Sequence, residues 1–333
     1  MSRSSVSSSP ACQARQVWAS NFDAEFSTFV SHVNGLRGCV LAFDVEFPGF
    51  FEDSRRGASR DAQYQALRSN VNLLNPVQLG IAVANQDGVV VGLWDFNLHF
   101  DIFCDLHMES AVALLSDAGL DFARHRFEGI SRAYFQRQCV ELLLPTLDRI
   151  KHRCQFVTFA GAYDYAYLIK LLTGPSLPST VNKCLALVDG IFPCRCELRD
   201  RLPYGSLGSL ASEFGVLRHG PAHAAASDAL VTLRLYRSTV VVEGCAVLPG
   251  LAAHADCFQV PTTMFRLPPG LCVAMPLVDV AGNVPFCDSR AKDASCHSWG
   301  KCARWESCRA SGKVPPPHVW CAAAREAAVA CVC

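Results

Sequence analysis

Two carboxylates interrupt an otherwise apolar segment of this 333-residue chain, residues 39–47. The β-branched and aromatic residues of this segment favour a buried strand, and Asp44 and Glu46 lie two residues apart within it. Because alternate residues of a strand face opposite sides, both acids share one face with Ala42, roughly 7 Å apart. Like charges buried this close repel, so a cation is expected beside them. An exposed edge strand with two solvated acids is the alternative.

A third acid, Asp164, follows a predicted strand at 155–160 and lies in the first turn of a predicted helix at 162–172. A carboxylate in this position is also typical of an ordinary cap or of a partner for the helix dipole.

A fourth acid, Asp228, lies five residues after His223, in a segment that follows the helix-breaking pair Gly220-Pro221. Five residues turn about 140° around a helix. The two side chains therefore converge only if His223 lies at the mouth of the helix and Asp228 lies further in. A helix with a capping His and a surface Asp is the alternative.

Together these side chains suggest metal-dependent phosphoryl chemistry. Asp44, Glu46, Asp164 and Asp228 offer the hard oxygens that Mg²⁺ or Mn²⁺ prefers. Two such ions about 4 Å apart clamp the attacking and leaving oxygens of a phosphoryl centre. His223 would act as the general base that deprotonates the attacking water.

The elements that must position these residues alternate between strand and helix. Strands at 77–84 and 89–100 flank a hairpin turn, and helical periodicity follows at 107–117, at 128–150 and at 223–242. This order predicts an α/β fold with a mixed sheet flanked by helices.

Three parts of the chain differ in amino-acid composition. Residues 1–20 are Ser-rich and predicted to be disordered, 21–243 form the predicted domain, and 244–333 are a Cys-, Pro- and Ala-rich extension of uncertain order.

Lys and Arg number 30 and so do Asp and Glu, so tight nucleic-acid binding by net charge alone is not expected. The sequence shows neither a secretory signal nor a membrane span, which predicts a protein of the cytoplasm and nucleus with free thiols.

Longer strings around the acids resemble one family closely. The strings are FDVEFPG, YQALRSNVNLL, VQLGIA, WDFNLHF, GAYDYAYLIKLLTGPSLP and GPAHAAASD, at residues 43–49, 64–74, 77–82, 94–100, 161–178 and 220–228. They resemble the Caf/Pop-type deadenylases, nuclease subunits of the CCR–NOT complex, within the histidine-bearing branch of the DEDD 3′–5′ exonucleases. The resemblance covers residues 21–243. The chain departs from the family pattern at residues 160–162, at Asn72 and at Glu197.

The resemblance implies a ribonuclease H-like fold and a poly(A)-specific exoribonuclease that shortens mRNA tails and releases 5′-AMP. It implies two divalent ions held by Asp44, Glu46, Asp164 and Asp228, with His223 as base. A helical scaffold subunit and a second deadenylase are the implied partners. Two alternatives stay open: a catalytically slow adaptor of the same complex, and a DEDD exonuclease acting on another RNA or DNA 3′ end.

Candidate substrate contacts lie beside the acids. Phe47 and Tyr163 could stack on unpaired bases, although aromatic residues beside a strand are more often core. Arg68 could meet phosphates or belong to a solvated helix face.

Four cysteines of the extension, Cys287, Cys296, Cys302 and Cys308, have the spacing x8, x5, x5. The first three match the opening of a CCCH zinc finger, with Cys308, His297 or His318 as the fourth ligand. Scattered free thiols in a weakly ordered tail are the alternative.

Overall fold

The computed structural model describes residues 13–53, 57–174 and 176–241. Within these ranges the site lies in one compact unit, which holds everything except residues 102–106. The predictions for residues 1–12 and for the extension, including the zinc candidates Cys287, Cys296, Cys302 and Cys308, lie outside the described residues and stay predictions. Metal analysis of the purified protein would check the zinc site.

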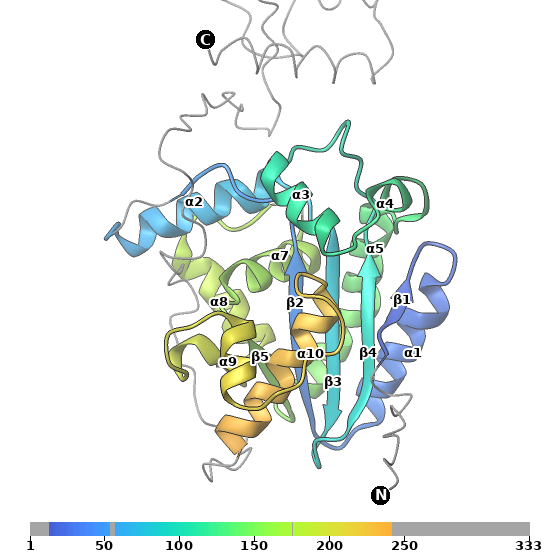
Figure 1. The fold of residues 1–333 in the computed structure, drawn as a ribbon, viewed down its shortest axis with the longest axis vertical. Helices are drawn as coiled ribbons and strands as arrows, with labels where there is room; N and C mark the ends of the chain where they lie inside the picture. The colour runs from blue at the N-terminus through green and yellow to red at the C-terminus, as the bar shows by residue number, and fades with distance from the viewer. Residues whose placement is uncertain (1–12, 54–56, 175, 242–333) are drawn as a thin grey trace, which may run out of the picture. The chain divides into compact units, whose positions relative to one another are not determined.

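A six-stranded mixed sheet forms the centre of the unit, in the order β1-β4-β3-β2-β5-β6 (Figure 1). β2, β3 and β4 form an antiparallel meander, while β1 pairs in parallel with β4, and β5 and β6 continue in parallel from β2. The strands span Arg15–Val17, Cys39–Glu46, Gln78–Asn85, Val90–Asn97, Cys154–Thr158 and Arg195–Glu197 in chain order. The predicted mixed α/β fold is confirmed.

Helices connect and cover the strands, and they include two short π-helical stretches, η2 and η4, and a 3₁₀ turn, η3. The α-helices are α1 Phe22–Gly35, α2 Arg60–Leu73, α3 Glu109–Asp117, α4 Phe122–Glu128, α5 Arg132–Gln138, α6 Leu144–Ile150, α7 Ala162–Thr173, α8 Val181–Ile191, α9 Leu207–Glu213 and α10 Ala225–Tyr236. The others are η2 Cys139–Leu143, η3 Leu198–Asp200 and η4 Arg237–Val241. Among the described residues no helix combines the length and apolar character that a membrane crossing requires.

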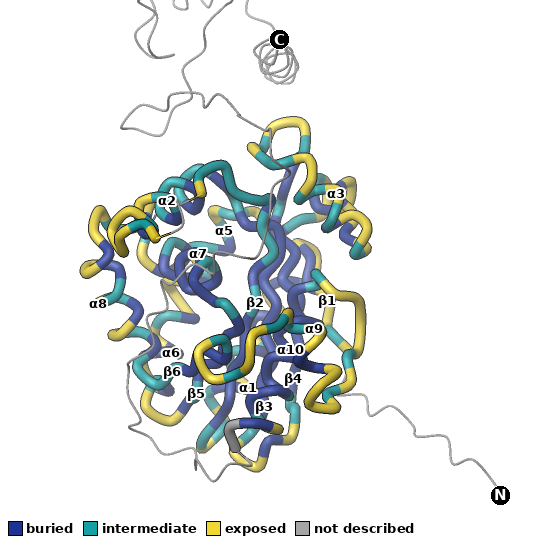
Figure 2. The backbone as a smooth tube through the Cα atoms, turned by 60° about the vertical axis from the view of Figure 1, so that its left-hand side comes forward, coloured by how far each residue is buried: buried dark blue, intermediate teal, exposed yellow. Residues whose placement is uncertain are grey.

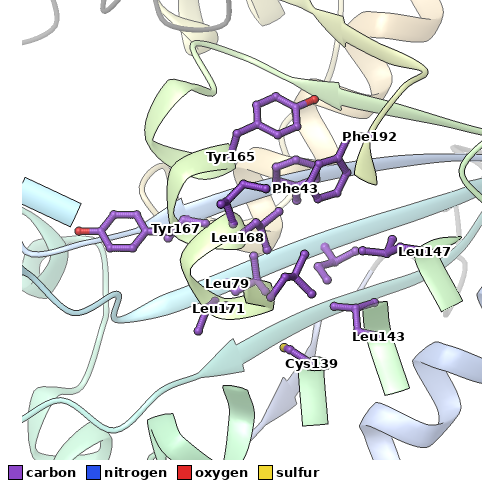
Figure 3. Packing of buried hydrophobic residues seen from close by; sticks show 14 of the residues in the cluster. Phe43, Leu79, Cys139, Leu143, Leu147, Tyr165, Tyr167, Leu168, Leu171 and Phe192 are labelled. Atoms are coloured by element: carbon purple, nitrogen blue, oxygen red, sulfur yellow. The ribbon is translucent and has the colours of Figure 1, made fainter. Parts of the chain in front are cut away.

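The two faces of the sheet carry different cores. One face packs large side chains of β2 such as Phe43 against Tyr165 of α7 and Phe192 after α8, as Figure 3 shows. The other face presents small residues such as Ala42 and Ala82 to α10, which crosses in front of β2 and β3 in Figure 1. This small-residue face lets the N-terminus of α10 approach the sheet closely.

Burial follows this layered arrangement. Figure 2 shows β2, β3 and β4 buried along most of their length, with exposure gathered in loops and helix ends. β2 is a central strand between β3 and β5, so the edge-strand interpretation of residues 39–47 is wrong.

The predicted N-terminal boundary is also wrong. Arg15–Val17, which the Ser-rich composition assigned to a disordered segment, form β1 beside β4. Burial of Val17 and Trp18 and the side chain of Gln16, which bonds Asp95, hold this short strand against the sheet.

Candidate active site

The carboxylates of β2 lie at the end of the strand nearest the loop to α2. Asp44 pairs in register with Gly80 of β3, and Glu46 pairs with Gln78. Burial raises the pKa of Asp44 well above its usual range, and the nearby charges of Asp164 and Glu46 add to this effect. Burial also raises the pKa of Glu46 to about 8, with added repulsion from Asp228 and Asp164. The predicted crowding of like charges is therefore present.

α7 brings Asp164 to these acids. The side chain is 7% exposed, and its Oδ1 accepts a 2.7 Å hydrogen bond from the backbone N–H of Val45, between the two acids of β2. Burial raises the pKa of Asp164 to about 8, despite that hydrogen bond. Since Gly161 is the cap residue of α7, Asp164 is a core-facing acid and not a helix cap.

The turn that starts α7 is held by a second buried acid, Glu197 of β6. Its carboxylate accepts hydrogen bonds from the backbone N–H groups of Ala160 (2.8 Å) and Gly161 (2.9 Å) and from Thr158 Oγ1 (2.9 Å). Ala160 has a φ of 59°, a left-handed conformation that these bonds stabilise. Sequence reasoning noted Glu197 only as a departure from the family pattern. In the structure, Glu197 holds the turn from which α7 starts, and this helix carries Asp164 in its first turn.

The opposite side of the site is built by α10, which carries Asp228. Two side chains of the sheet accept from its first backbone N–H groups: Gln78 Oε1 from Ala225 at 2.9 Å, and Asp95 Oδ1 from Ala226 at 2.7 Å. Burial raises the pKa of Asp95 to about 6. Sequence reasoning missed Asp95, although an acid on a predicted buried strand was an available signal.

Gly80 sets how closely α10 approaches the sheet. A Cβ added to this glycine would lie 2.0 Å from the carbonyl carbon of Ala225 and 2.2 Å from the nitrogen of Ala226. Only a glycine leaves this space for the helix backbone.

His223 lies in the loop before α10, as the spacing argument required. Its φ of 61° is in the left-handed region, and its backbone N–H donates to Asp228 Oδ2 at 3.0 Å. One ligand atom from each of Glu46, His223 and Asp228 lies within 4.8 Å of the others. Asp228 is 8% exposed, so the surface-Asp interpretation is wrong.

The structure thus gathers Asp44, Glu46, Asp164, Asp228 and His223 from three distant parts of the chain. Asp44 and Asp164 lie outside the tight group of three potential ligands but repel its members electrostatically. This set fits hard divalent cations, because it offers carboxylate oxygens whose mutual repulsion and burial such ions would offset.

The three residues predicted to contact substrate make contacts within the fold instead. Phe47 and Tyr163 stack on each other, with ring centroids 4.9 Å apart and planes 17° apart, and both pack against the main core. Asn70 donates to the Tyr163 hydroxyl at 2.9 Å. Arg68 donates its Nε to the carbonyl oxygen of Leu177 at 3.2 Å. All three side chains have structural contacts here.

Comparison with known sequences finds similar ribonucleases. The family described as "CAF1 family ribonuclease" matches residues 17–153. The chain is 31% identical over 232 residues to "Poly(A) ribonuclease pop2" of Schizosaccharomyces pombe, covering 67% of this chain and 68% of that protein. It is 29% identical over 241 residues to "Probable CCR4-associated factor 1 homolog 7" of Arabidopsis thaliana, covering 68% and 86%.

Comparison with solved structures agrees. The S. pombe Pop2p structure, a form with Mg²⁺ and Mn²⁺ bound, superposes with a TM-score of 0.62 at 30% sequence identity. The match covers 68% of this chain and 93% of that chain.

Proposed function

Because the chain belongs to the CAF1 family of ribonucleases, we propose that it shortens the poly(A) tails of mRNA from the 3′ end and releases 5′-AMP. The ribonuclease H-like fold expected from the sequence is confirmed. The observation that carries the proposal is the convergence of Asp44, Glu46, Asp164 and Asp228 beside His223, because a hydrolase of phosphodiesters needs such a cluster and a binding module does not.

Asp44, Glu46, Asp164 and Asp228 would hold two divalent ions, Mg²⁺ or Mn²⁺. The S. pombe relative with both ions bound supports this assignment. Bound ions would supply the positive charge that stabilises the attacking and leaving oxygens. Since the chain itself has no net charge, ions would also help to draw the RNA backbone to the site.

His223 would take the proton from the attacking water. The hydrogen bond from its backbone N–H to Asp228 holds His223 beside the acids. Its left-handed backbone conformation belongs to the loop before α10, so His223 approaches the site from that loop and not from the helix. Val45, through its hydrogen bond to Asp164, would keep that acid in place while the water attacks.

Partners are proposed on the same family basis. A relative named as a CCR4-associated factor supports association with a second deadenylase. A scaffold subunit of the CCR–NOT complex as a partner, and a location in the cytoplasm and nucleus, are further parts of the proposal that follow from the expectations of the sequence. Co-purification with tagged subunits, and imaging of the tagged chain, would check both. We also propose that the nuclease domain extends from β1 to η4, with the chain beyond it as an appendage.

A labelled RNA that ends in an A-tail tests the activity. The full chain with Mg²⁺ should shorten the tail nucleotide by nucleotide and stop in EDTA, and a matched RNA with a mixed 3′ end should be a poorer substrate. Asp44→Ala should abolish turnover while circular dichroism stays unchanged. An equal rate on both RNAs would point to another DEDD substrate, and an intact tail in every condition would point to an adaptor.

A further inference from the structure

A single cationic side chain of the loop between α9 and α10 lies against the acidic cluster. Arg218 Nη1 forms an ion pair with Oδ1 of Asp228 and also contacts Ser227 Oγ at 3.2 Å and the carbonyl oxygen of Pro221 at 3.4 Å. The pair is largely shielded from water, with 21% of the Arg218 side chain and 11% of the Asp228 side chain exposed. The two side chains are more buried than those of an ordinary surface ion pair, so removing either one would leave a poorly solvated charge in the site.

Both oxygens of Asp228 are therefore engaged. Oδ1 faces Arg218, and Oδ2 accepts the backbone N–H of His223. A divalent cation that binds through Asp228 must compete with the guanidinium of Arg218, because two positive charges bound to one carboxylate repel each other. Arg218 and the ion cannot both have their best interaction with this carboxylate.

The loop that carries Arg218 has backbone positions suited to rearrangement. Gly215 (φ +67°) and Gly220 (φ +102°) bracket the residue, and both adopt the left-handed conformation that favours glycine. Leu217 beside it is 75% exposed. Arg234 of α10 donates to the carbonyl oxygen of Leu217 at 2.9 Å and anchors the loop.

We propose that Arg218 is a phosphate-binding residue that pairs with Asp228 in the metal-free protein and moves to an oxygen of the scissile phosphodiester when metal and RNA bind. The inference rests on the proposed function. A guanidinium keeps its charge at any working pH, and its forked donors match the two non-bridging oxygens of a phosphate. The same loop carries His223, so release of Arg218 from Asp228 would occur next to the general base.

This role predicts two effects of opposite sign. Loss of Arg218 removes the competitor for Asp228, so metal should bind more tightly. It also removes a contact to the phosphate, so turnover should fall. A residue that only held the loop in shape would weaken metal binding and turnover together.

The test compares Arg218→Gln and Arg218→Lys with the control Arg234→Gln in the full chain. Titration calorimetry with Mn²⁺ alone gives the metal affinity. Binding of an oligo(A) RNA in Ca²⁺, checked to leave the RNA intact, gives the substrate affinity. Two versions of this RNA are used, one with an ordinary last linkage and one with an uncharged methylphosphonate there. Tail shortening in Mg²⁺ gives kcat and KM.

For Arg218→Gln we expect Mn²⁺ to bind about five- to tenfold more tightly and kcat to fall on the order of 100-fold. The wild-type preference for the charged linkage should shrink to the part that the bound Ca²⁺ supplies. Arg218→Lys should keep the Mn²⁺ affinity near that of wild type and regain part of the turnover, because it retains the charge but not the fork. Arg234→Gln, which removes only a contact that holds the loop, should not separate the two effects: its Mn²⁺ affinity and its kcat should stay near wild type or fall together.

Unchanged or weaker Mn²⁺ binding in Arg218→Gln would overturn the inference. So would an Arg234→Gln variant that shows the same opposed effects, or a preference for the charged linkage that is as large in Arg218→Gln as in wild type. If wild-type protein leaves the A-tail intact, the proposed function fails instead, and the Mn²⁺ titration still decides whether Arg218 competes for Asp228.

Discussion

α7 and α10 each deliver one acid to the site, but they hold it in different ways. Asp164 of α7 is fixed by a backbone N–H of the neighbouring strand, and a core of large aromatic residues lies behind the helix. Asp228 of α10 is held by the side chain of Arg218 and by the backbone of His223, both in an exposed loop. One acid is built into the core, whereas the other depends on an element that can adjust.

The cores under the two helices fit this difference. α7 packs against Phe43 and Tyr165 contacts Phe192, so its position is set by interlocking rings. α10 rests on Ala42, Ala82 and Gly80, where small residues allow close approach, and polar groups of the sheet hold its first turn. The site therefore joins a fixed half to an adjustable half at β2.

The largest expected effect comes from replacing the two acids separately. Asp164→Asn and Asp228→Asn should each lower turnover on the order of 10³-fold, because each removes a carboxylate from the charge-stabilising cluster. Their effects on the metal-free protein should be opposite. Asp164→Asn relieves repulsion and should raise the melting temperature. Asp228→Asn also relieves repulsion on Glu46, but it leaves the largely buried guanidinium of Arg218 without its charged partner, and this loss should lower the melting temperature.

Thermal melting in EDTA measures this contrast. Asn at either position keeps the size of the side chain and its carbonyl acceptor, so packing is matched between the two variants. Shifts of equal sign and size in both variants would contradict the division of the site into two halves.

Two glycines provide a purely steric comparison. Gly80→Ala places a methyl group 2.0 Å from the backbone of α10, and no side-chain rotation can relieve a clash with backbone atoms. We expect a loss of about 3 kcal/mol in unfolding free energy together with a large loss of turnover, as Asp228 moves with the helix. At Gly161 the added Cβ would meet the side chain of Thr158 at 2.4 Å, and that contact lies at the start of α7.

Denaturant unfolding of both variants checks the comparison. Gly161→Ala should cost about 1–2 kcal/mol, because its closest contact, with the Cβ of Thr158 at 2.4 Å, is longer than the 2.0 Å contact at Gly80 and involves one residue and not the backbone of a helix. A greater loss in Gly161→Ala than in Gly80→Ala would show that α7, and not α10, is the less tolerant half.

The pH dependence of stability sharpens the comparison further. The folded-state pKa values of Glu46 and Asp164, both about 8, and of Asp95, about 6, are raised above their ordinary values by burial. A group with a raised carboxyl pKa stabilises the fold below its unfolded pKa, and this stabilisation is lost as pH rises through the folded pKa. The metal-free protein should therefore lose stability steadily as the pH rises from about 5 to about 8.

Chemical unfolding at several pH values in EDTA measures this decline. Asp164→Asn should flatten the decline over this whole interval, because the neutral amide removes a group whose proton binding differs between the folded and unfolded protein throughout it. Mg²⁺ should restore more stability at pH 8 than at pH 5, since protonated acids bind it poorly. A metal-free protein that is more stable at pH 8 than at pH 5 would contradict the raised pKa values.

The sequence predicted the catalytic strand and the acids better than it predicted their supports. Alternation within residues 39–47 assigned Asp44 and Glu46 to one face, and the structure places them on the face that α10 covers. Local pattern was sufficient here because a strand fixes side-chain direction by its own geometry. The tertiary partners Glu197, Asp95 and Arg218 could not be found this way, since each acts on a residue far away in sequence or across a loop.

Some elements were missed although their signal was present. α1 buries Phe22, Phe26, Phe29 and Val33 at spacings of four, three and four residues, which is typical of an amphipathic helix. The periodic segment 128–150, interrupted by Pro145 in the sequence, divides into α5, the π-helical η2 and α6, and Pro145 lies in the first turn of α6. The π-helical stretch before it, which packs against α5, α6 and α7, has no signal in the local pattern.

The smallest expected effect concerns the end of α7 that lies away from its acid. Lys170 is mostly buried, and its Nζ donates to the carbonyl oxygens of Val71 at 2.6 Å, Asn72 at 3.3 Å and Leu74 at 3.4 Å, where α2 ends. Lys170→Met keeps the apolar stem but leaves these carbonyls without their donor. We expect a loss of roughly 1–2 kcal/mol in unfolding free energy with kcat unchanged, measured by urea unfolding and tail shortening.

The pair of Lys151 with Asp148, whose acidic partner is 70% exposed, offers a control for this variant. Lys151→Met should leave both stability and kcat as in wild type, because a surface ion pair contributes little. If α7 is the fixed half of the site, loosening its distal end should not reach Asp164, because Val45 and the turn held by Glu197 still determine where that acid lies. A fall in kcat that exceeds the loss of folded protein would mean that Asp164 is positioned through the whole length of α7, and the contrast with α10 would then rest on the loop of Arg218 alone.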